Sequence, residues 1–322
     1  MIEERSLTEV LMMKIVVAEP LGVAPEHIKE VCKEYLGEDL SPVIYEDRAE
    51  SEAELIGRCK DADVVIEVNQ PLSAEFIKSC PRLQLIAAAF AGIDHIDAEA
   101  CEEAGVTIAN CPGYSASAVA ELVFGFLTVL KRRLIEEDAA ARKGETRKGF
   151  VGTEIGGKKF GIVGFGHIGK AVAKIAKAYG CEVYAHTRTP QSDEGVTFLP
   201  LDELLSVCDI VSLHLPLTAS SKGLISAEKI ARMKDGAILI NTARGPIVDS
   251  EALAEAVKSG KLAGAGIDVF ETEPPIDIHH PLFGSDRIVT SPHIGFATEE
   301  AFETRLHMTF RNIAEFMASS DR

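Results

Sequence analysis

Short apolar runs alternate with segments of helical periodicity along most of the chain, beginning near residue 14. Five runs in the first half are predicted as strands, over Lys14–Ala18, Pro42–Tyr45, Val64–Val68, Leu85–Ala89 and Val106–Ala109. The segments between them carry apolar residues at helical spacing, over Pro25–Tyr35, Glu52–Cys59, Ala74–Ser79 and Asp97–Ala104. Strands that alternate with helices over short connections are typical of βαβ units, so this pattern predicts a parallel sheet covered by helices.

The second half of the chain repeats this design after a long apolar segment. Ser115–Arg133 begins with serines that can cap a helix and ends with basic residues that suit a helix C-terminus, so we expect one connecting helix. A polar stretch, Glu136–Thr153, follows, and a second alternating series runs from Lys159 to about Thr290. A last amphipathic helix, Glu299–Met317, has no strand of its own and is expected to fold back on the first domain.

The pattern therefore predicts an α/β protein of two doubly wound parallel-sheet domains, Rossmann-like and flavodoxin-like, with a cleft between them. The expected domains are residues 13–111 with 294–322, and residues 112–293, which include the helix at 115–133. We expect the cleft to be hinged near 111–113 and 293–296.

Composition narrows the classes of partner. Lys and Arg number 33 against 50 Asp and Glu, and this net charge of −17 disfavours nucleic acid and anionic membranes. No apolar run reaches the roughly 20 residues that span a bilayer, and the N-terminus does not resemble a signal peptide. The 7 cysteines are scattered and contain no CxxC pair, so we expect reduced thiols, no zinc site and a cytoplasmic protein. Residues 1–11 precede Met12-Met13 and are interpreted as a frayed extension or a misassigned start.

A glycine-rich turn lies between a predicted strand and a predicted helix of the second half. Gly164-Phe-Gly166-His-Ile-Gly169 follows the apolar run 159–163 and precedes the helical segment 170–179. In such a turn Gly164 permits the sharp bend, Gly166 lets backbone N–H groups approach a pyrophosphate, and Gly169 lets the helix pack on the strand. The spacing predicts a dinucleotide site in residues 112–293 and leaves substrate binding to the other domain.

The end of the next predicted strand bears on the choice of cofactor. An NAD site normally has an acidic residue there, whereas this chain has Thr187-Arg188. A guanidinium can bind a 2′-phosphate, so the pair favours NADP(H) slightly over NAD(H). Asp193 and Glu194 lie close by and keep NAD(H) open.

Three polar residues occur at or after the ends of predicted strands, where an open α/β sheet binds its ligands. Arg244 follows Ala237–Ile240, Glu273 lies in the segment 268–274, and His293 follows Ile288–Thr290. An imidazolium is a suitable acid near neutral pH, and a neighbouring carboxylate favours its charged form. A guanidinium can bind a carboxylate and polarise a carbonyl. Residues of these types suit the reduction of a 2-oxo acid by hydride from a nicotinamide. The adjacent His279-His280 is interpreted as surface loop, so no metal site is expected.

At this point the chain resembles the D-isomer-specific 2-hydroxyacid dehydrogenases over nearly its whole length. The resemblance rests on the glycine turn, the trio and several blocks in the same order: Ala91–Asp97, Ala120-Glu121, Leu213–Pro216, Asn241–Gly245, Gly264–Pro274 and Pro292-His293. It implies that Arg244, Glu273 and His293 form the catalytic set, that Ala91-Gly92 hold the substrate carboxylate, and that Asp268 contacts the nicotinamide amide. Asn69 and Phe90 are expected to border the substrate, with Phe90 limiting its size. Further cofactor contacts are expected from His167, Ile168, Thr187, Arg188, His214, Leu215, Pro216, Thr218, Thr242, Ala243, His293 and Gly295.

The sequence also favours particular substrates and an oligomeric state. Glyoxylate, hydroxypyruvate or pyruvate is favoured over phosphoglycerate, because family members acting on phosphoglycerate tend to carry Arg where this chain has Asn69. Formate oxidation and a non-catalytic NAD(H)-sensing module of the same fold stay open as alternatives. The apolar helix over Val119–Leu130 predicts a homodimer, with packing between domains as the alternative.

Overall fold

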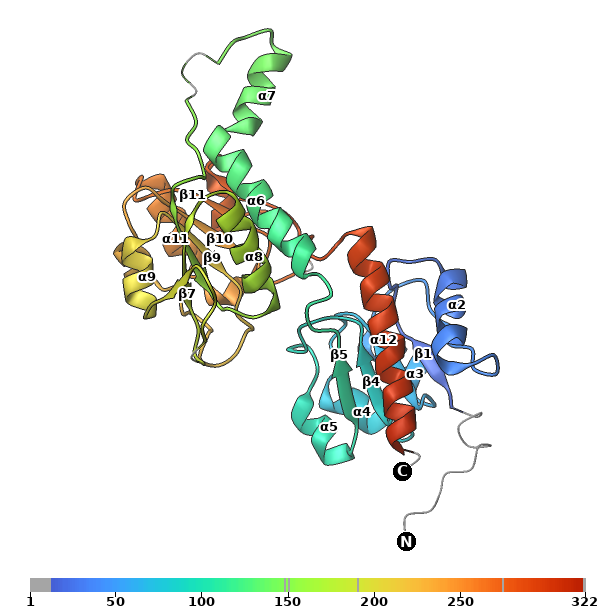
Figure 1. Ribbon diagram of the computed structural model, residues 1–322. Coiled ribbons are helices and arrows are strands. Elements are labelled where there is room, and N and C mark those ends of the chain that lie inside the picture. The colour runs from blue at the N-terminus through green and yellow to red at the C-terminus, as the bar shows by residue number, and fades with distance from the viewer. Residues whose placement is uncertain (1–12, 148, 150, 190, 274, 321–322) are drawn as a thin grey trace. The chain divides into compact units, whose positions relative to one another are not determined.

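The computed structural model describes residues 13–147, 149, 151–189, 191–273 and 275–320 (Figure 1). It divides into two compact units. The first contains the chain up to Tyr114 together with the part from Thr298 onward, and the second is Ser115–Ala297. The breaks lie a few residues beyond the expected domain boundaries. The interpretation of residues 1–11 falls outside the described residues.

The first unit is a five-stranded parallel sheet with helices on both faces. Its strand order is β2-β1-β3-β4-β5, the flavodoxin-like order. The strands are β1 (Ile15–Val17), β2 (Val43–Ile44), β3 (Val64–Glu67), β4 (Leu85–Ala88) and β5 (Thr107–Asn110). The helices are α2 (Pro25–Leu36), α3 (Glu52–Cys59), α4 (Ala74–Ser79), α5 (Ala98–Ala104) and α12 (Glu299–Ser320). α12 packs against α2, β4 and β5, so the end of the chain completes the first unit.

The second unit has a seven-stranded parallel sheet with the order β12-β11-β10-β9-β6-β7-β8. The strands are β6 (Lys159–Val163), β7 (Glu182–His186), β8 (Val196–Phe198), β9 (Ile210–Leu213), β10 (Ala237–Asn241), β11 (Leu262–Ile267) and β12 (Ile288–Thr290). The helices are α6 (Ala116–Arg132), α7 (Leu134–Arg142), α8 (His167–Ala178), α9 (Leu201–Val207), α10 (Ala227–Arg232) and α11 (Ser250–Lys258), with short 3₁₀ turns η1 (Gly245–Ile247) and η2 (Pro281–Gly284). The order reverses between β6 and β9, as in a Rossmann fold, so the predicted fold class is confirmed.

The central strands of both sheets are buried along their whole length, because helices cover both faces. All residues of β3, β4, β9 and β10 are buried. Strands buried on both faces consist of continuous apolar runs rather than alternating ones, which is why these segments are conspicuous in the sequence.

The long connecting helix is present as α6, and its apolar face is used within the second unit. Phe124 stacks on Phe160 and on Tyr179, with ring centroids 5.6 and 5.0 Å apart. Phe126 and Leu127 are buried in the same core. The apolar character of this helix is therefore largely explained by packing against its own sheet, which removes the main argument that the sequence offered for a dimer.

Helix α7 is absent from the sequence prediction, which has a polar stretch there. It is drawn in green beyond the end of α6 in Figure 1. Of its residues only Ala140 is buried, whereas Leu134 and Ile135 are 45% and 58% exposed. The segment has no apolar periodicity, so its helix rests on the intrinsic propensity of Ala, Glu and Arg rather than on core packing. Among the described residues, no helix is long and apolar enough to cross a membrane.

Candidate active site

The glycine turn joins β6 to α8 and has the geometry that its residue types predict. Gly164 has φ +98°, and a Cβ there would lie 2.4 Å from the carbonyl oxygen of His214. A Cβ at Gly169 would lie 2.2 Å from the carbonyl oxygen of Gly164, so the helix can approach the strand only with glycine here. Around Gly166, by contrast, the space for a Cβ is open. The turn therefore offers backbone N–H groups and the N-terminus of α8 to an anion.

A cavity of about 610 Å³ opens beside this turn, at the carboxyl edge of the second sheet. Of the predicted cofactor residues, eight line it: Gly164, Gly166, Thr187, Arg188, His214, Leu215, Pro216 and Thr218. The sequence analysis missed the other lining residues, which are Phe165, His186, Thr189, Gln191, Ser220, Ser221 and Leu224. Of their polar members, His186 ends β7 and the others lie in the segments after β7 and β9, and this position at the end of a strand is the signal that could have found them.

Two buried polar atoms at this edge have no hydrogen-bond partner among the described residues. They are Nδ1 of His214, after β9, and Oγ1 of Thr242, after β10. Nε2 of His214 lies 2.9 Å from Oγ of Ser212, and burial lowers the pKa of this imidazole to about 3, so the ring is neutral. Buried polar atoms are rarely left unsatisfied, so both are suited to contact a polar ligand. With the glycine turn, they fit a bound dinucleotide.

Other predicted cofactor residues lie at the same edge but do not line the cavity. His167 and Ile168 form the first turn of α8. Ala243 is buried, and its N–H donates to Oδ1 of Asn241 over 3.0 Å. Gly295 is also buried, in the turn after β12.

The histidine and the glutamate of the trio form a close pair. Nδ1 of His293 lies 2.7 Å from Oε1 of Glu273, and each side chain is about one-fifth exposed. The other carboxylate oxygen accepts from the backbone N–H of Phe270 over 3.2 Å. This second bond fixes the carboxylate, which in turn orients the imidazole through Nδ1.

His293 has a backbone conformation that needs support. Its φ is +53°, in the left-handed region that costs a non-glycine residue free energy. The buried Asp268 supplies the support: Oδ1 accepts from Oγ of Ser291 and from N–H of Ile294, and Oδ2 accepts from N–H of Gly295. Burial raises the pKa of Asp268, while these hydrogen bonds act against the rise. The sequence analysis gave Asp268 only a cofactor contact and missed its support of this turn.

Arg244 lies in the loop between β10 and η1, half-buried. Its Nη1 donates to the carbonyl oxygen of Ala243 over 2.8 Å, and its own carbonyl oxygen accepts from Asn241 over 3.0 Å. The next residue must be small, because a Cβ at Gly245 would lie 2.0 Å from the backbone of Phe270. This close approach joins the loop that carries Arg244 to the loop that carries Glu273.

The predicted substrate residues lie at the carboxyl edge of the first sheet. Asn69 follows β3, and its loop is held by two charged residues that the sequence analysis missed. Oε1 of the buried Glu19 accepts from the backbone N–H groups of residues 68, 69 and 70 over 2.8 to 3.0 Å. Arg48 donates to Oδ1 and to the carbonyl oxygen of Asn69 over 2.8 and 3.2 Å. An acidic residue just after a buried strand was the available signal for Glu19.

The second substrate loop of the first unit follows β4. Phe90 is 6% exposed, with its ring centroid 6.2 Å from that of Tyr114, whereas Ala91 and Gly92 are half-exposed. Behind the two loops lies the pair of Glu67 and His95, with Oε2 and Nε2 2.8 Å apart.

This pair was also missed by the sequence analysis. Glu67 is fully buried, and burial raises the pKa of its carboxyl group. Like Glu19, it stands at the end of a buried strand.

Within the second unit, a dinucleotide cradle and an imidazole–carboxylate pair thus share one sheet edge, which defines the class as a nicotinamide-dependent oxidoreductase. The family model for the D-isomer specific 2-hydroxyacid dehydrogenase, NAD binding domain, matches residues 124–295. A hydroxypyruvate reductase of Thermotoga maritima is 42% identical over 252 residues, covering 77% of this chain and 82% of the relative. A glyoxylate reductase of Thermococcus litoralis is 38% identical over 275 residues, covering 81% and 82%.

Among solved structures, an acyclic imino acid reductase in complex with NADPH and D-Arg matches with a TM-score of 0.88. It is 29% identical, and the match covers 96% of this chain and 98% of that one. The chain belongs to the D-isomer-specific 2-hydroxyacid dehydrogenase family.

Proposed function

We propose that the chain reduces a small 2-oxo acid to the D-2-hydroxy acid, with glyoxylate, hydroxypyruvate or pyruvate as substrate. The observation that carries the proposal is the pair of His293 and Glu273, 2.7 Å apart, at the sheet edge that carries the dinucleotide cradle. The similarity to proteins named hydroxypyruvate reductase and glyoxylate reductase supports this substrate class.

The chain's own residues would handle the proton and the substrate. A bound nicotinamide supplies the hydride. His293 donates a proton from Nε2 to the nascent alkoxide, and Glu273 stabilises the imidazolium through Nδ1. Arg244 binds the substrate carboxylate and polarises the carbonyl. Backbone N–H groups of Ala91-Gly92, with Asn69 and Phe90, are proposed as further substrate contacts from the first unit.

The cofactor preference is proposed as NADP(H) over NAD(H). Thr187 and Arg188 line the cavity, so a guanidinium is available to a 2′-phosphate. Asp193, which kept NAD(H) open in the sequence, is engaged elsewhere, since its Oδ1 accepts from Nζ of Lys177 over 2.9 Å. The same lysine donates to the carbonyl oxygen of Glu194.

Phosphoglycerate is disfavoured by Asn69 but retains one supporting observation. Arg48 reaches this asparagine from another loop, so a guanidinium does lie beside the position where phosphoglycerate-specific relatives carry Arg. Phosphohydroxypyruvate therefore belongs in the substrate test.

The test follows absorbance at 340 nm with NADPH or NADH against glyoxylate, hydroxypyruvate, pyruvate and phosphohydroxypyruvate. We expect turnover with at least one of the first three acids, and higher kcat/KM with NADPH. Cofactor binding without turnover of any acid would contradict the proposal and favour formate chemistry or a cofactor-sensing role. Turnover of phosphohydroxypyruvate alone would replace the proposed substrate.

A homodimer stays a proposal, and its support moves from α6 to α7. Leu134 and Ile135 are exposed on a helix with little packing of its own. A second copy would bury this apolar surface. Light scattering of the wild type and of Leu134→Glu should give a dimer and a smaller species, whereas a monomeric wild type at micromolar concentration would contradict the proposal.

A further inference from the structure

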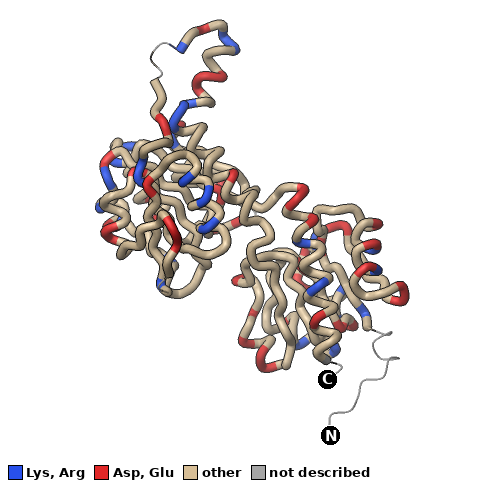
Figure 2. The backbone as a smooth tube through the Cα atoms, viewed as in Figure 1, with Lys and Arg blue, Asp and Glu red and all other residues tan. Residues whose placement is uncertain are grey.

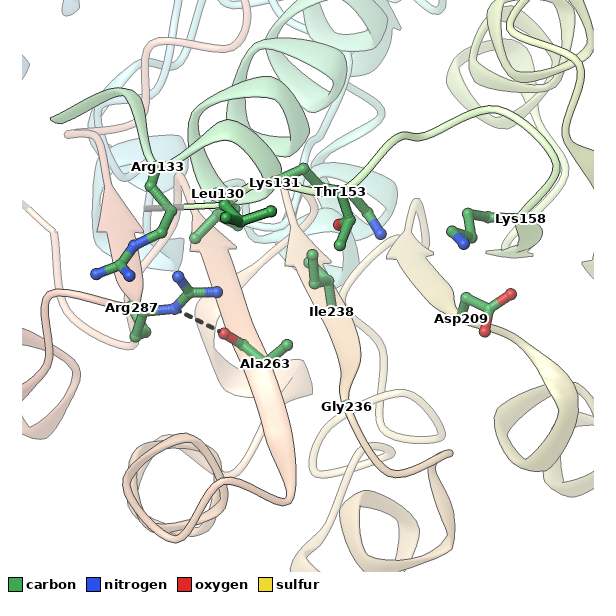
Figure 3. Close-up of a pocket in the computed structure, with 11 residues that line it drawn as sticks. Leu130, Lys131, Arg133, Thr153, Lys158, Asp209, Gly236, Ile238, Ala263 and Arg287 are labelled. Carbon is green, nitrogen blue, oxygen red and sulfur yellow. Dashed lines mark hydrogen bonds between the residues drawn. The ribbon is translucent and has the colours of Figure 1, made fainter. Parts of the chain in front are cut away.

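A second cavity, of about 290 Å³, opens at the opposite edge of the second sheet, where its strands begin (Figure 3). Four of its eleven lining residues directly precede strands: Lys158 before β6, Asp209 before β9, Gly236 before β10 and Arg287 before β12. The end of α6 and the junction with α7 contribute Lys131 and Arg133. The cofactor cavity lies at the carboxyl ends of β6, β7 and β9, so the two cavities are at opposite edges of the same sheet.

Positive charge dominates this second cavity, although the chain carries a net charge of −17. Four cationic side chains and one carboxylate line it. The basic residues 131–133 form part of the blue stretch at the end of α6 in Figure 2. Figure 3 shows the two arginines on one side of the cavity and Lys158 beside Asp209 on the other.

The single carboxylate is already engaged by other groups. Asp209 accepts from the backbone N–H of Lys159 over 2.9 Å and from Nζ of Lys234 over 2.6 Å. Arg133 is also partly neutralised, since its Nε lies 3.0 Å from Oε1 of Glu136. Within the described parts of the chain, neither Lys131 nor Lys158 forms an ion pair.

The two lysine ammonium groups also disfavour one another. Burial lowers the pKa of Lys131, and the charge of Lys158 lowers it further, while Asp209 acts in the opposite direction. Arg287 is oriented into the cavity wall by a bond from Nε to the carbonyl oxygen of Ala263, 2.9 Å long. Like charges held in a partly desolvated space cost free energy, and a multivalent anion would remove this cost.

We propose that this amino-edge cavity binds a phosphate dianion, free or as the monoester of a small metabolite, through Lys131, Lys158 and Arg287. The volume suffices, because a water molecule takes roughly 30 Å³ in the liquid and the cavity is many times larger. Ammonium and guanidinium groups form charge-assisted hydrogen bonds with phosphate oxygens, and three converging cations hold a dianion more strongly than a monoanion.

Lysine acylation tests the proposal on the unaltered full-length chain. The protein is treated with an acetylating ester at constant ionic strength, with chloride or inorganic phosphate, and acetylation of each lysine is followed by mass spectrometry. At a phosphate concentration about five times the dissociation constant, Lys131 and Lys158 should react about sixfold more slowly, while the exposed Lys258 of α11 reacts unchanged. Equal slowing of all three lysines, or none, would overturn the proposal.

Calorimetric titration with inorganic phosphate adds a test by variants. All proteins carry Arg188→Ala, so that phosphate binding at the cofactor cavity is weakened in each. The double variant Lys131→Gln/Lys158→Gln should bind phosphate about tenfold more weakly than its parent, and Lys258→Gln should match the parent. Unchanged affinity in the folded double variant would overturn the proposal.

A second titrant distinguishes free phosphate from the phosphate monoester of a metabolite as the ligand. Glycerol 3-phosphate that protects Lys131 and Lys158 better than inorganic phosphate identifies a metabolite as the ligand, and weaker protection identifies the free ion. Protection that rises with protein concentration and is indifferent to phosphate would show instead that an acidic segment of a second copy fills the cavity, which would overturn the proposal.

Discussion

The two edges of the second sheet differ in how their charged side chains are paired. At the carboxyl edge, the histidine proposed for catalysis has defined neighbours: Glu273 holds His293, and Asp268 holds the turn around it. At the amino edge, Lys131 and Lys158 face a cavity in which the one carboxylate is engaged by other groups. The carboxyl edge is thus organised in advance for chemistry, whereas the amino edge is suited to bind an anion.

Outside the pair of His293 and Glu273, the largest effect is expected from Arg244, which should act only at the carboxyl edge. Arg244→Ala removes the proposed donors to the substrate carboxylate and carbonyl, so kcat/KM should fall by about 10²- to 10³-fold. NADPH affinity, measured by fluorescence, should change little. The exposed Arg311→Ala is the matched control and should retain wild-type kinetics. A loss below about threefold for Arg244→Ala would remove this residue from the proposed machinery.

A smaller effect is expected where Asp268 supports the turn of His293. Asp268→Asn places an amide against the backbone N–H groups that the carboxylate accepts from, so kcat should fall by about ten- to fiftyfold. Because the change displaces the histidine rather than the substrate, KM for the oxo acid should stay within about twofold. Ser291→Ala, which removes one of the three donors, should cost less. An increase confined to KM for the cofactor would show that Asp268 serves the nicotinamide alone.

Replacement of Arg188 should lower the preference for NADPH over NADH by about tenfold. Arg188→Ala removes a charged partner of the 2′-phosphate, so KM for NADPH should rise about tenfold while KM for NADH stays nearly constant. Asp193→Asn is the control, because this carboxylate is bound to Lys177. Equal increases in both KM values would contradict the assignment of Arg188 to the 2′-phosphate.

The smallest effect concerns the pH dependence of stability. The pKa of His214 is about 3 in the folded chain, below its ordinary 6.5, so only the unfolded chain takes up this proton between these values. Stability should therefore fall as the pH drops below 6.5, by up to about 1.4 kcal/mol per pH unit from this group.

Denaturant unfolding of the wild type and of His214→Asn between pH 7.5 and 4.5 measures this contribution. The difference in unfolding free energy should be constant above pH 6.5 and shrink below it. Parallel curves over the whole range would contradict this prediction, because they would show that the imidazole takes up its proton at the same pH in the folded and in the unfolded chain.

Most of the fold was predictable because the strands are buried on both faces and are read as continuous apolar runs. The glycine turn was predictable for the same kind of reason, since close backbone approach requires glycine at positions 164 and 169. Helix α7 was not predictable from apolar periodicity, because it buries only Ala140.

The trio stood out because Arg244, Glu273 and His293 follow strands, and the structure pairs the latter two. What the sequence could not show is support across long separations. Glu19 holds a loop 49 to 51 residues away. Its place just after a strand marks it as unusual, but nothing in the sequence identifies the loop that it contacts. The cavity of Lys131 and Lys158 could not be predicted for the same reason, because its residues are single positions at the end of α6 and at the starts of separate strands.

The central claim is that the imidazole at the carboxyl edge carries the proton of the reduction. The most direct measurement is single-turnover oxidation of NADPH with saturating glyoxylate or hydroxypyruvate, for the wild type and for His293→Gln. We predict that the rate falls by about 10²- to 10⁴-fold while NADPH affinity stays within about twofold. A variant that binds NADPH and turns over within about threefold of the wild type would contradict the account.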